Sequence, residues 1–207
     1  MINIDQLKQL REETSAPVKD CTKALEEAEG DISKAKEILK RLGKILAEKK
    51  TEREVKEGII DSYLHSNKKV GAILEIRCES DFVAKSDDFQ NLSHEICLHI
   101  TAANPLFISE QDIPEEIQEK EKAMYLEQMA NSGKDKKIIT GKKPDISPRV
   151  MDQVIEGKWA KYKQEVCLLE QNWIKDDTKK IKDLLAESIA KLGENIVIRS
   201  FKRLSIR

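Results

Sequence analysis

Long apolar runs are missing from this sequence. Its 207 residues contain no stretch of about 18 consecutive apolar residues, so the sequence predicts no transmembrane helix. The first residues, MINIDQLKQLREETS, lack the apolar core of a signal peptide and the Arg- and Ser-rich character of a transit peptide. We therefore expect one or two compact domains in the cytoplasm, with no membrane association.

Paired cysteines and an excess of basic charge are missing as well. Cys21, Cys78, Cys97 and Cys167 are widely spaced with no CxxC pair, which argues against a disulfide framework or a zinc site and favours reduced thiols. The 37 basic and 38 acidic residues leave a net charge of -1, so no basic field is available to hold nucleic acid. This composition favours a protein or small-molecule partner over direct binding of nucleic acid.

Signatures of the common enzyme classes are absent too. The sequence has no GxxxxGK, GxGxxG, HExxH or GxSxG motif. His94 and His99 are five residues apart and so do not share a helical face as two metal ligands would. His94 and Cys97 could approach each other on a helix, which keeps a thiol nucleophile as an alternative, although helical spacing produces such pairs by chance. We expect no metal site and no cofactor.

Amphipathic helices fill the first 43 residues. In the first helix, apolar residues recur at helical spacing behind Asn3, and Gln6 is placed to complete a capping pair. Pro17 suits the first turn of a second helix, Asp31 caps a third, and we expect that third helix to end at Gly43. The apolar stripes are Ile4, Leu7 and Leu10, then Val18, Cys21, Leu25 and Ala28, then Ile32, Ala35, Ile38, Leu39 and Leu42. Three such helices must pack on one another as a small module.

Strands and further helices follow a charged segment. GIIDSYLH and VGAILEIRC flank SNKK and predict an antiparallel hairpin, with Ala72, Leu74, Ile76 and Cys78 on one face. The late run NIVIRSFKRL predicts a strand that joins this sheet. Helices are predicted from Phe89 to near the ANP at residues 103–105, and from Pro114 to about Ser132. Two more are predicted from Pro148 through Val150, Val154, Trp159 and Tyr162, and from Ile181 to Leu192, before Gly193. Residues 134–150 are expected to form a turn-rich loop without a site.

The stretch RCESDFVAKSDDF, residues 77–89, raises the question of where Phe82 points. An aromatic residue at the end of a strand usually packs into the core. Polar neighbours on both sides of Phe82 leave exposure as the alternative.

Several motifs together resemble the elongation factor Ts family, the guanine-nucleotide exchange factors of elongation factor Tu. They are LREETSAPVKDCTKALEEAEGDISKA, EGII, LEIRCESDFVAKSDDF, EGKWAKYKQEVCLLEQNWIKDDTKKIKDLL and GENIVIRSFKRL. The motifs occur in the family's order and cover most of the chain. The resemblance implies a three-helix domain of the ubiquitin-associated type at residues 1–45, a connecting arm at 46–57 and an α+β core at 58–207, with a small antiparallel sheet covered by helices.

The resemblance also implies a mechanism. Ser80, Asp81, Phe82 and Val83 match the family's Thr-Asp-Phe-Val motif, in which Phe82 would wedge into the partner's nucleotide domain, Asp81 would anchor the approach, and Mg²⁺ would be displaced. The ion belongs to the partner's site, and exchange is driven by binding energy without enzyme chemistry.

Partner contacts are also implied for the N-terminal module. The resemblance places Arg11, Val18 and Lys19 against the partner, with Lys19 at a position that is often apolar in relatives and Ser15 where the family usually has Gly. An adaptor that uses its ubiquitin-associated-like module to bind a protein without exchange is the alternative. Short relatives can form homodimers, for which Trp159, Tyr162 and Trp173 are interface candidates, and core packing is the other interpretation of these three.

Overall fold

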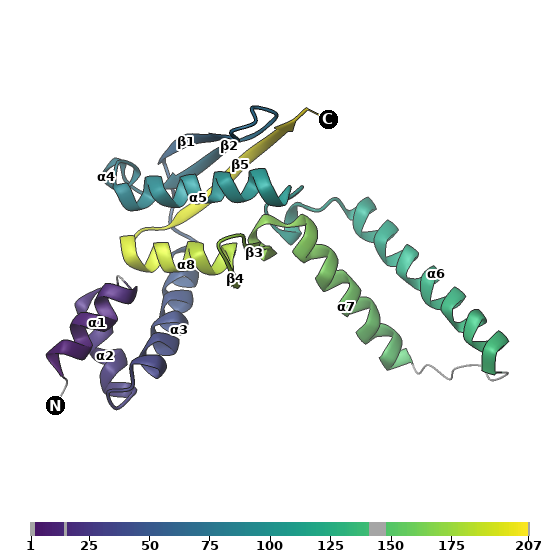
Figure 1. Cartoon of the computed structure of the whole chain (residues 1–207), viewed down its shortest axis with the longest axis horizontal. Coiled ribbons are helices and arrows are strands. Elements are labelled where there is room, and N and C mark those ends of the chain that lie inside the picture. Colours follow the sequence, from purple (N-terminus) through teal and green to yellow (C-terminus); the bar gives the residue numbers. More distant parts are fainter. Residues whose placement is uncertain (1–2, 15, 141–147, 207) are drawn as a thin grey trace. The chain divides into compact units, whose positions relative to one another are not determined.

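The computed structural model describes the backbone of residues 3–14, 16–140 and 148–206, and the side chains of these residues outside 129–151. The chain divides into two compact units, Met1–Ala103 with Trp173–Arg207, and Asn104–Asn172 (Figure 1). Ser15 and residues 141–147, part of the predicted loop, lie outside the described residues. None of the helices in the described part of the chain combines the length and the apolar character needed to cross a membrane.

The first unit contains both helices and strands, and strand β3 (Asn172–Trp173) begins at the last residue of the second unit. In chain order the elements are α1 (Ile4–Thr14), α2 (Val18–Glu27), α3 (Ile32–Lys50), β1 (Glu57–Leu64), β2 (Val70–Cys78), α4 (Asp81–Ala84), α5 (Asp87–Ala103), β3 (Asn172–Trp173), β4 (Asp176–Lys180), α8 (Ile181–Leu192) and β5 (Ile196–Ser205). Helices and a small antiparallel sheet together make an α+β fold, which confirms the predicted fold class.

The first three helices share one core, as the apolar stripes predict. Its buried side chains are Leu10, Cys21, Ala24, Leu25, Ala28 and Ala35. The Asp31 carboxylate caps α3 by accepting hydrogen bonds from the amides of Ser33 and Lys34 at 2.8 and 3.1 Å. The side-chain NH₂ group of Gln6 donates to the Gly30 carbonyl at 2.9 Å, which ties α1 to the end of α2, and the predicted capping role of Gln6 stays a prediction.

The prediction that the third helix ends at Gly43 is also wrong. Helix α3 continues to Lys50, and buried Gly43 lies against Ala190 of α8. A glycine inside a helix costs about 1 kcal/mol relative to alanine, and tertiary packing of α3 on α8 offsets this cost. Lys44 also forms an ion pair with Asp183 of α8 at 2.8 Å. The helix therefore crosses the boundary expected at residue 45, and the proposed division into domains stays a prediction.

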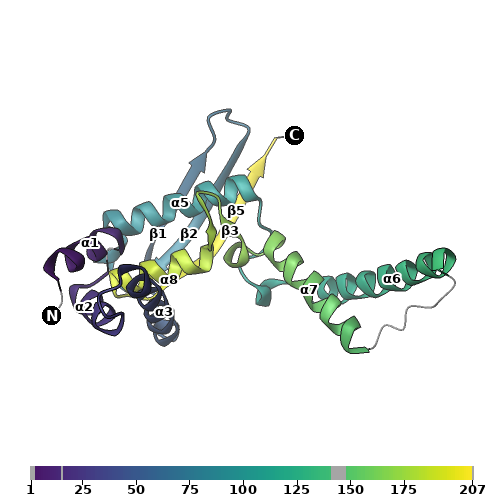
Figure 2. The ribbon, with the colours of Figure 1, turned by 60° about the horizontal axis from the view of Figure 1, so that its bottom comes forward.

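The main sheet has the order β1-β2-β5, and a second sheet pairs β3 with β4. The main sheet confirms the predicted antiparallel hairpin and the addition of the last strand to it, while the order of the three strands comes from the structure. Its inner face carries Ala72, Leu74, Ile76 and Cys78, all of them buried. Figures 1 and 2 show α5 against this sheet, α8 beside α5, and α3 against α8. On the opposite face, the apolar side chains of Ile60, Leu64, Ile73 and Leu204 are at least half exposed.

The second unit is a helical hairpin with a small core. It consists of η1 (Glu110–Asp112), α6 (Glu115–Thr140), α7 (Pro148–Val166) and η2 (Leu168–Glu170). Helix α6 extends beyond Ser132, so the prediction of a loop is wrong for residues 134–140.

The three aromatic residues predicted as interface candidates, Trp159, Tyr162 and Trp173, differ in their environments. Trp159 is buried, stacks on Tyr162 with ring centroids 5.4 Å apart, and donates to the Glu110 carboxylate at 2.9 Å. Both side chains belong to the packing of the second unit, which favours the core interpretation for these two residues. Trp173 is half-buried.

Candidate partner-binding site

The chain leaves strand β2 through a single helical turn. Cys78 ends the strand, Ser80 is extended at φ -126 and ψ 157, and helix α4 then spans only Asp81–Ala84. The Ser80 hydroxyl accepts a hydrogen bond from the amide of Val83 at 3.4 Å, so Ser80 is the N-cap of this turn. We call residues 80–83 the exchange turn, after the role that the family resemblance implies for them.

A glycine allows the chain to pass close to this exit. Gly58 of β1 pairs with Arg77 of β2 and has a φ of +155°. A Cβ atom here would lie 2.3 Å from the Ile76 carbonyl oxygen. Only glycine fits such an approach, which explains the Gly in the EGII motif.

The side chain of Phe82 points into solvent. It is 85% exposed, whereas Val83 is half-buried and Ala84 is buried. On a helical turn, residues 80, 83 and 84 share one face, so anchoring that face to the protein turns Phe82 outward. The exposed alternative for Phe82 is therefore confirmed.

Asp81, beside Phe82, is already engaged in an ion pair. Its carboxylate accepts a hydrogen bond from the Lys85 ammonium at 2.8 Å, one helical turn away. This hydrogen bond and the charge of Lys85 lower the pKa of Asp81, and both side chains are exposed. Asp81 is therefore already paired with Lys85 in the free protein, before it could contact a partner. The sequence alone does not predict this ion pair.

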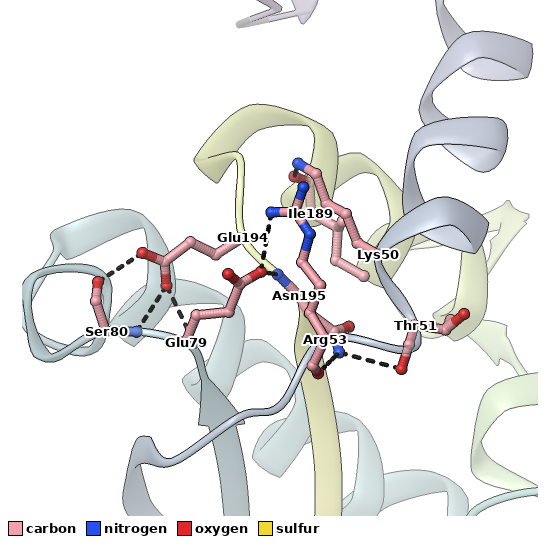
Figure 3. A network of polar contacts seen from close by, with 8 residues as sticks. All are labelled: Lys50, Thr51, Arg53, Glu79, Ser80, Ile189, Glu194 and Asn195. Atoms are coloured by element: carbon pink, nitrogen blue, oxygen red, sulfur yellow. Dashed lines mark hydrogen bonds and ion pairs between the residues drawn. The ribbon is translucent and has the colours of Figure 1, made fainter.

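A carboxylate from a distant part of the chain holds the start of the exchange turn. Glu194, which follows α8, accepts hydrogen bonds from the amides of Glu79 and Ser80 at 3.1 and 2.9 Å through Oε2. Its Oε1 accepts from the Ser80 hydroxyl at 2.5 Å. Figure 3 shows the carboxylate facing both residues. Sequence reasoning assigned Glu194 no role, and its only signal was the GENI motif before the last strand.

Asn195 extends this network to the segment after α3. Its backbone amide donates to Glu79 Oε1 at 2.6 Å, and its side-chain amide donates to the carbonyl oxygens of Arg53 and Thr51 at 2.9 and 3.5 Å. Asn195 itself is buried. The exit of β2, the entry of β5 and the segment after α3 thus meet at one polar cluster (Figure 3).

The predicted contacts of the N-terminal module lie near the junction of α1 and α2. Arg11, Val18 and Lys19 are all exposed, Val18 by 46%. The predicted stripe of the second helix is wrong for Val18, because the other three members are buried and Val18 is not. Pro17 is the N-cap of α2 and lies just before its first turn.

The environments of the other candidate residues do not favour nucleophilic chemistry. Burial, followed by the charge of Asp61, raises the pKa of Cys97 to about 12, so its thiolate is scarce at neutral pH. The His94 ring packs edge-on against Tyr63 at 5.7 Å. All four cysteines lie among the described residues and are buried and free. Within the described part of the chain, His, Cys, Asp and Glu side chains form no group of three suited to a metal ion.

The fold and the site define an α+β protein that presents exposed side chains on a helical module and on a short, well-anchored turn. The sequence profile of the family described as Elongation factor TS matches residues 6–188. The chain belongs to the elongation factor Ts family.

Curated relatives support this assignment over nearly the full length. Elongation factor Ts of Thermoanaerobacter sp. (strain X514) is 46% identical over 203 residues, covering 98% of this chain and 94% of the relative. That of Thermotoga petrophila is 46% identical over 205 residues, covering 99% and 96%. That of Thermosipho melanesiensis is 43% identical over 206 residues, covering 100% and 99%. The predicted family is confirmed, and membership implies a translation factor that promotes nucleotide exchange by binding.

Proposed function

We propose that this protein binds elongation factor Tu in its GDP form and promotes GDP release by inserting Phe82 into the partner's nucleotide domain. The insertion displaces Mg²⁺ from the partner's site, and GTP then replaces GDP. The observation that carries the proposal is the 85% exposure of Phe82 on a turn whose start is held by hydrogen bonds. An exposed aromatic side chain gains about 1.5–3 kcal/mol when a partner buries it.

Phe82 alone does not supply enough energy for strong exchange. A factor that weakens nucleotide binding is itself weakened equally by the nucleotide. A coupling of ten-thousand-fold requires about 5.5 kcal/mol of differential binding, which exceeds the contribution of one aromatic side chain. We assign the remainder to the rest of the core and to the N-terminal module, with Arg11, Val18 and Lys19 as the module's contacts. Asp81 orients the approach of the turn.

Stopped-flow release of a fluorescent GDP analogue from the cognate elongation factor Tu tests this proposal. The wild-type protein should accelerate release, and Phe82→Ala should reduce the maximal rate by about tenfold or more. Leu106→Ala is the matched control, because Leu106 is also exposed, by 60%, and lies in the second unit. No acceleration by the wild type would refute the proposal, and an unchanged rate for Phe82→Ala would remove the wedge from it.

Contacts of the N-terminal module can be tested separately. Arg11→Ala and Val18→Asp should raise the concentration of this protein that gives half-maximal GDP release. Lys23→Ala, on the exposed surface of the same helix as Val18, serves as the control. Binding without any change in GDP release would indicate the adaptor alternative. The homodimer and the cytoplasmic location stay predictions.

A further inference from the structure

We infer that Glu194 is a positioning residue for the exchange turn and determines the direction in which Phe82 projects. The inference rests on the proposed function of Phe82. Glu194 lies 114 residues from Ser80 in the sequence and does not need to touch the partner in order to act.

Helix α4 is too short to hold its own shape. Its four residues form a single turn, and an isolated turn is unfavourable because several dihedral angles must be fixed for the first hydrogen bond. Its conformation must therefore be imposed by its surroundings. Ala84 supplies a buried contact on one side, and Ser80 supplies the cap on the other.

Glu194 controls that cap. Its two oxygens accept hydrogen bonds from the Glu79 amide, the Ser80 amide and the Ser80 hydroxyl, the donors immediately before Asp81 and Phe82. Because the Ser80 hydroxyl donates its proton to Glu194, its lone pairs remain available to the amide of Val83. One carboxylate thus sets both the backbone direction entering the turn and the cap that closes it.

Glu194 is itself held on both sides. Gly193 ends α8 in the left-handed region at φ 80, and its amide donates to the Ile189 carbonyl at 3.0 Å. On the other side, buried Asn195 donates its backbone amide to Glu79 at 2.6 Å. The position of the exchange turn is therefore fixed by α8 and β5 as well as by β2, the strand that it follows.

Without the Glu194 carboxylate, the exchange turn should populate several conformations. Only the fraction with Phe82 correctly directed would be competent, and the measured activity falls in proportion to that fraction. A preorganised turn avoids this loss when it meets its partner. The removal of hydrogen bonds to a charged group predicts about a tenfold decrease in the rate of GDP release.

Three variants test the inference in the stopped-flow assay. Glu194→Ala should lower the maximal rate of GDP release about tenfold. Glu194→Gln should recover most of that loss, because its carbonyl oxygen can accept from both amides and its NH₂ group can donate to the Ser80 hydroxyl. Glu54→Ala is the control, since the Glu54 side chain is 76% exposed on the segment between α3 and β1. It should leave the rate unchanged.

Amide hydrogen exchange of the full-length chain alone provides a readout without the partner. Glu194→Ala should speed exchange about tenfold or more at residues 79–86, while amides of β2 and α5 keep their wild-type rates. Unchanged exchange at residues 79–86 would overturn the inference. An equal rise in the amide exchange rates of β2 and α5 would also overturn it, because that indicates general destabilisation. So would a wild-type rate of GDP release in the assay with a Glu194→Ala variant whose turn exchanges faster. If the wild-type protein does not accelerate GDP release from elongation factor Tu, the proposed function fails. Hydrogen exchange alone then decides whether Glu194 fixes the turn.

Discussion

Two phenylalanines seven residues apart have opposite environments. Phe82 in α4 is 85% exposed, and Phe89 in α5 is fully buried. Both lie in the same polar stretch, RCESDFVAKSDDF. The residue type and its immediate neighbours therefore do not decide which aromatic side chain joins the core.

The difference lies in what holds each segment. Helix α5 has 17 residues and an apolar face, including Phe89, Leu92 and Ile96, that is buried against the protein. Helix α4 is held by its Ser80 cap, by Glu194 and by the small contact of Ala84. Hydrogen bonds and a buried alanine can fix a turn without its aromatic residue, which leaves Phe82 free for a partner. The predictions below test this separation of stability from binding.

The largest effect is expected in the core. Phe89→Ala should lower the free energy of unfolding by about 3–5 kcal/mol, because it removes a fully buried ring and leaves a cavity. Urea unfolding followed by circular dichroism measures this loss. A loss below about 1 kcal/mol would contradict the assignment of Phe89 to the core.

Burial in α5 should also slow alkylation of the Cys97 thiol. With the pKa of Cys97 raised to about 12, its thiolate at pH 8 should be on the order of a thousandfold scarcer than that of an ordinary cysteine. Alkylation followed by mass spectrometry should show Cys97 reacting slowly in the folded chain and rapidly in denaturant. Rapid and selective labelling of Cys97 in the folded chain would instead support the thiol nucleophile.

Phe82→Ala should barely change stability, in contrast to the same substitution at Phe89. Its side chain is mostly in water in the free protein, so the free energy of unfolding should change by less than about 0.5 kcal/mol. Urea unfolding of the two variants side by side provides the comparison. A loss comparable to that of Phe89→Ala would mean that Phe82 supports the fold, and the separation would fail.

The smallest effect concerns Asp81 beside Phe82. Lys85→Met should raise the pKa of Asp81 towards its ordinary value of 3.8, because the hydrogen bond and the charge of Lys85 hold it lower. The pKa of Asp81 in the folded protein is lower than in the unfolded chain. The ion pair is therefore complete above about pH 4 and is lost as the pH falls through the lowered pKa of the folded protein. Titration of the carboxyl carbon by NMR measures the shift. An unchanged pKa would show that the pair does not form in solution.

Much of the architecture follows from local patterns. Alternation in VGAILEIRC predicts which face of β2 is buried, and Asp31 and Gly193 mark helix ends, because strand periodicity and caps depend on residues a few positions apart. The family and the α+β fold were likewise predictable from ordered motifs along the chain.

Tertiary structure decided the features that depend on distant residues. Gly43 remains inside α3 because α8 packs against it. Phe82 is exposed on a turn whose start is held by Glu194, more than a hundred residues later in the sequence. Local propensity is worth only about 1 kcal/mol per residue, so packing and buried hydrogen bonds from elsewhere in the chain override it. The sequence alone determined most of the longer elements and the family, whereas long-range contacts determined how far α3 extends and what holds the turn that carries Phe82.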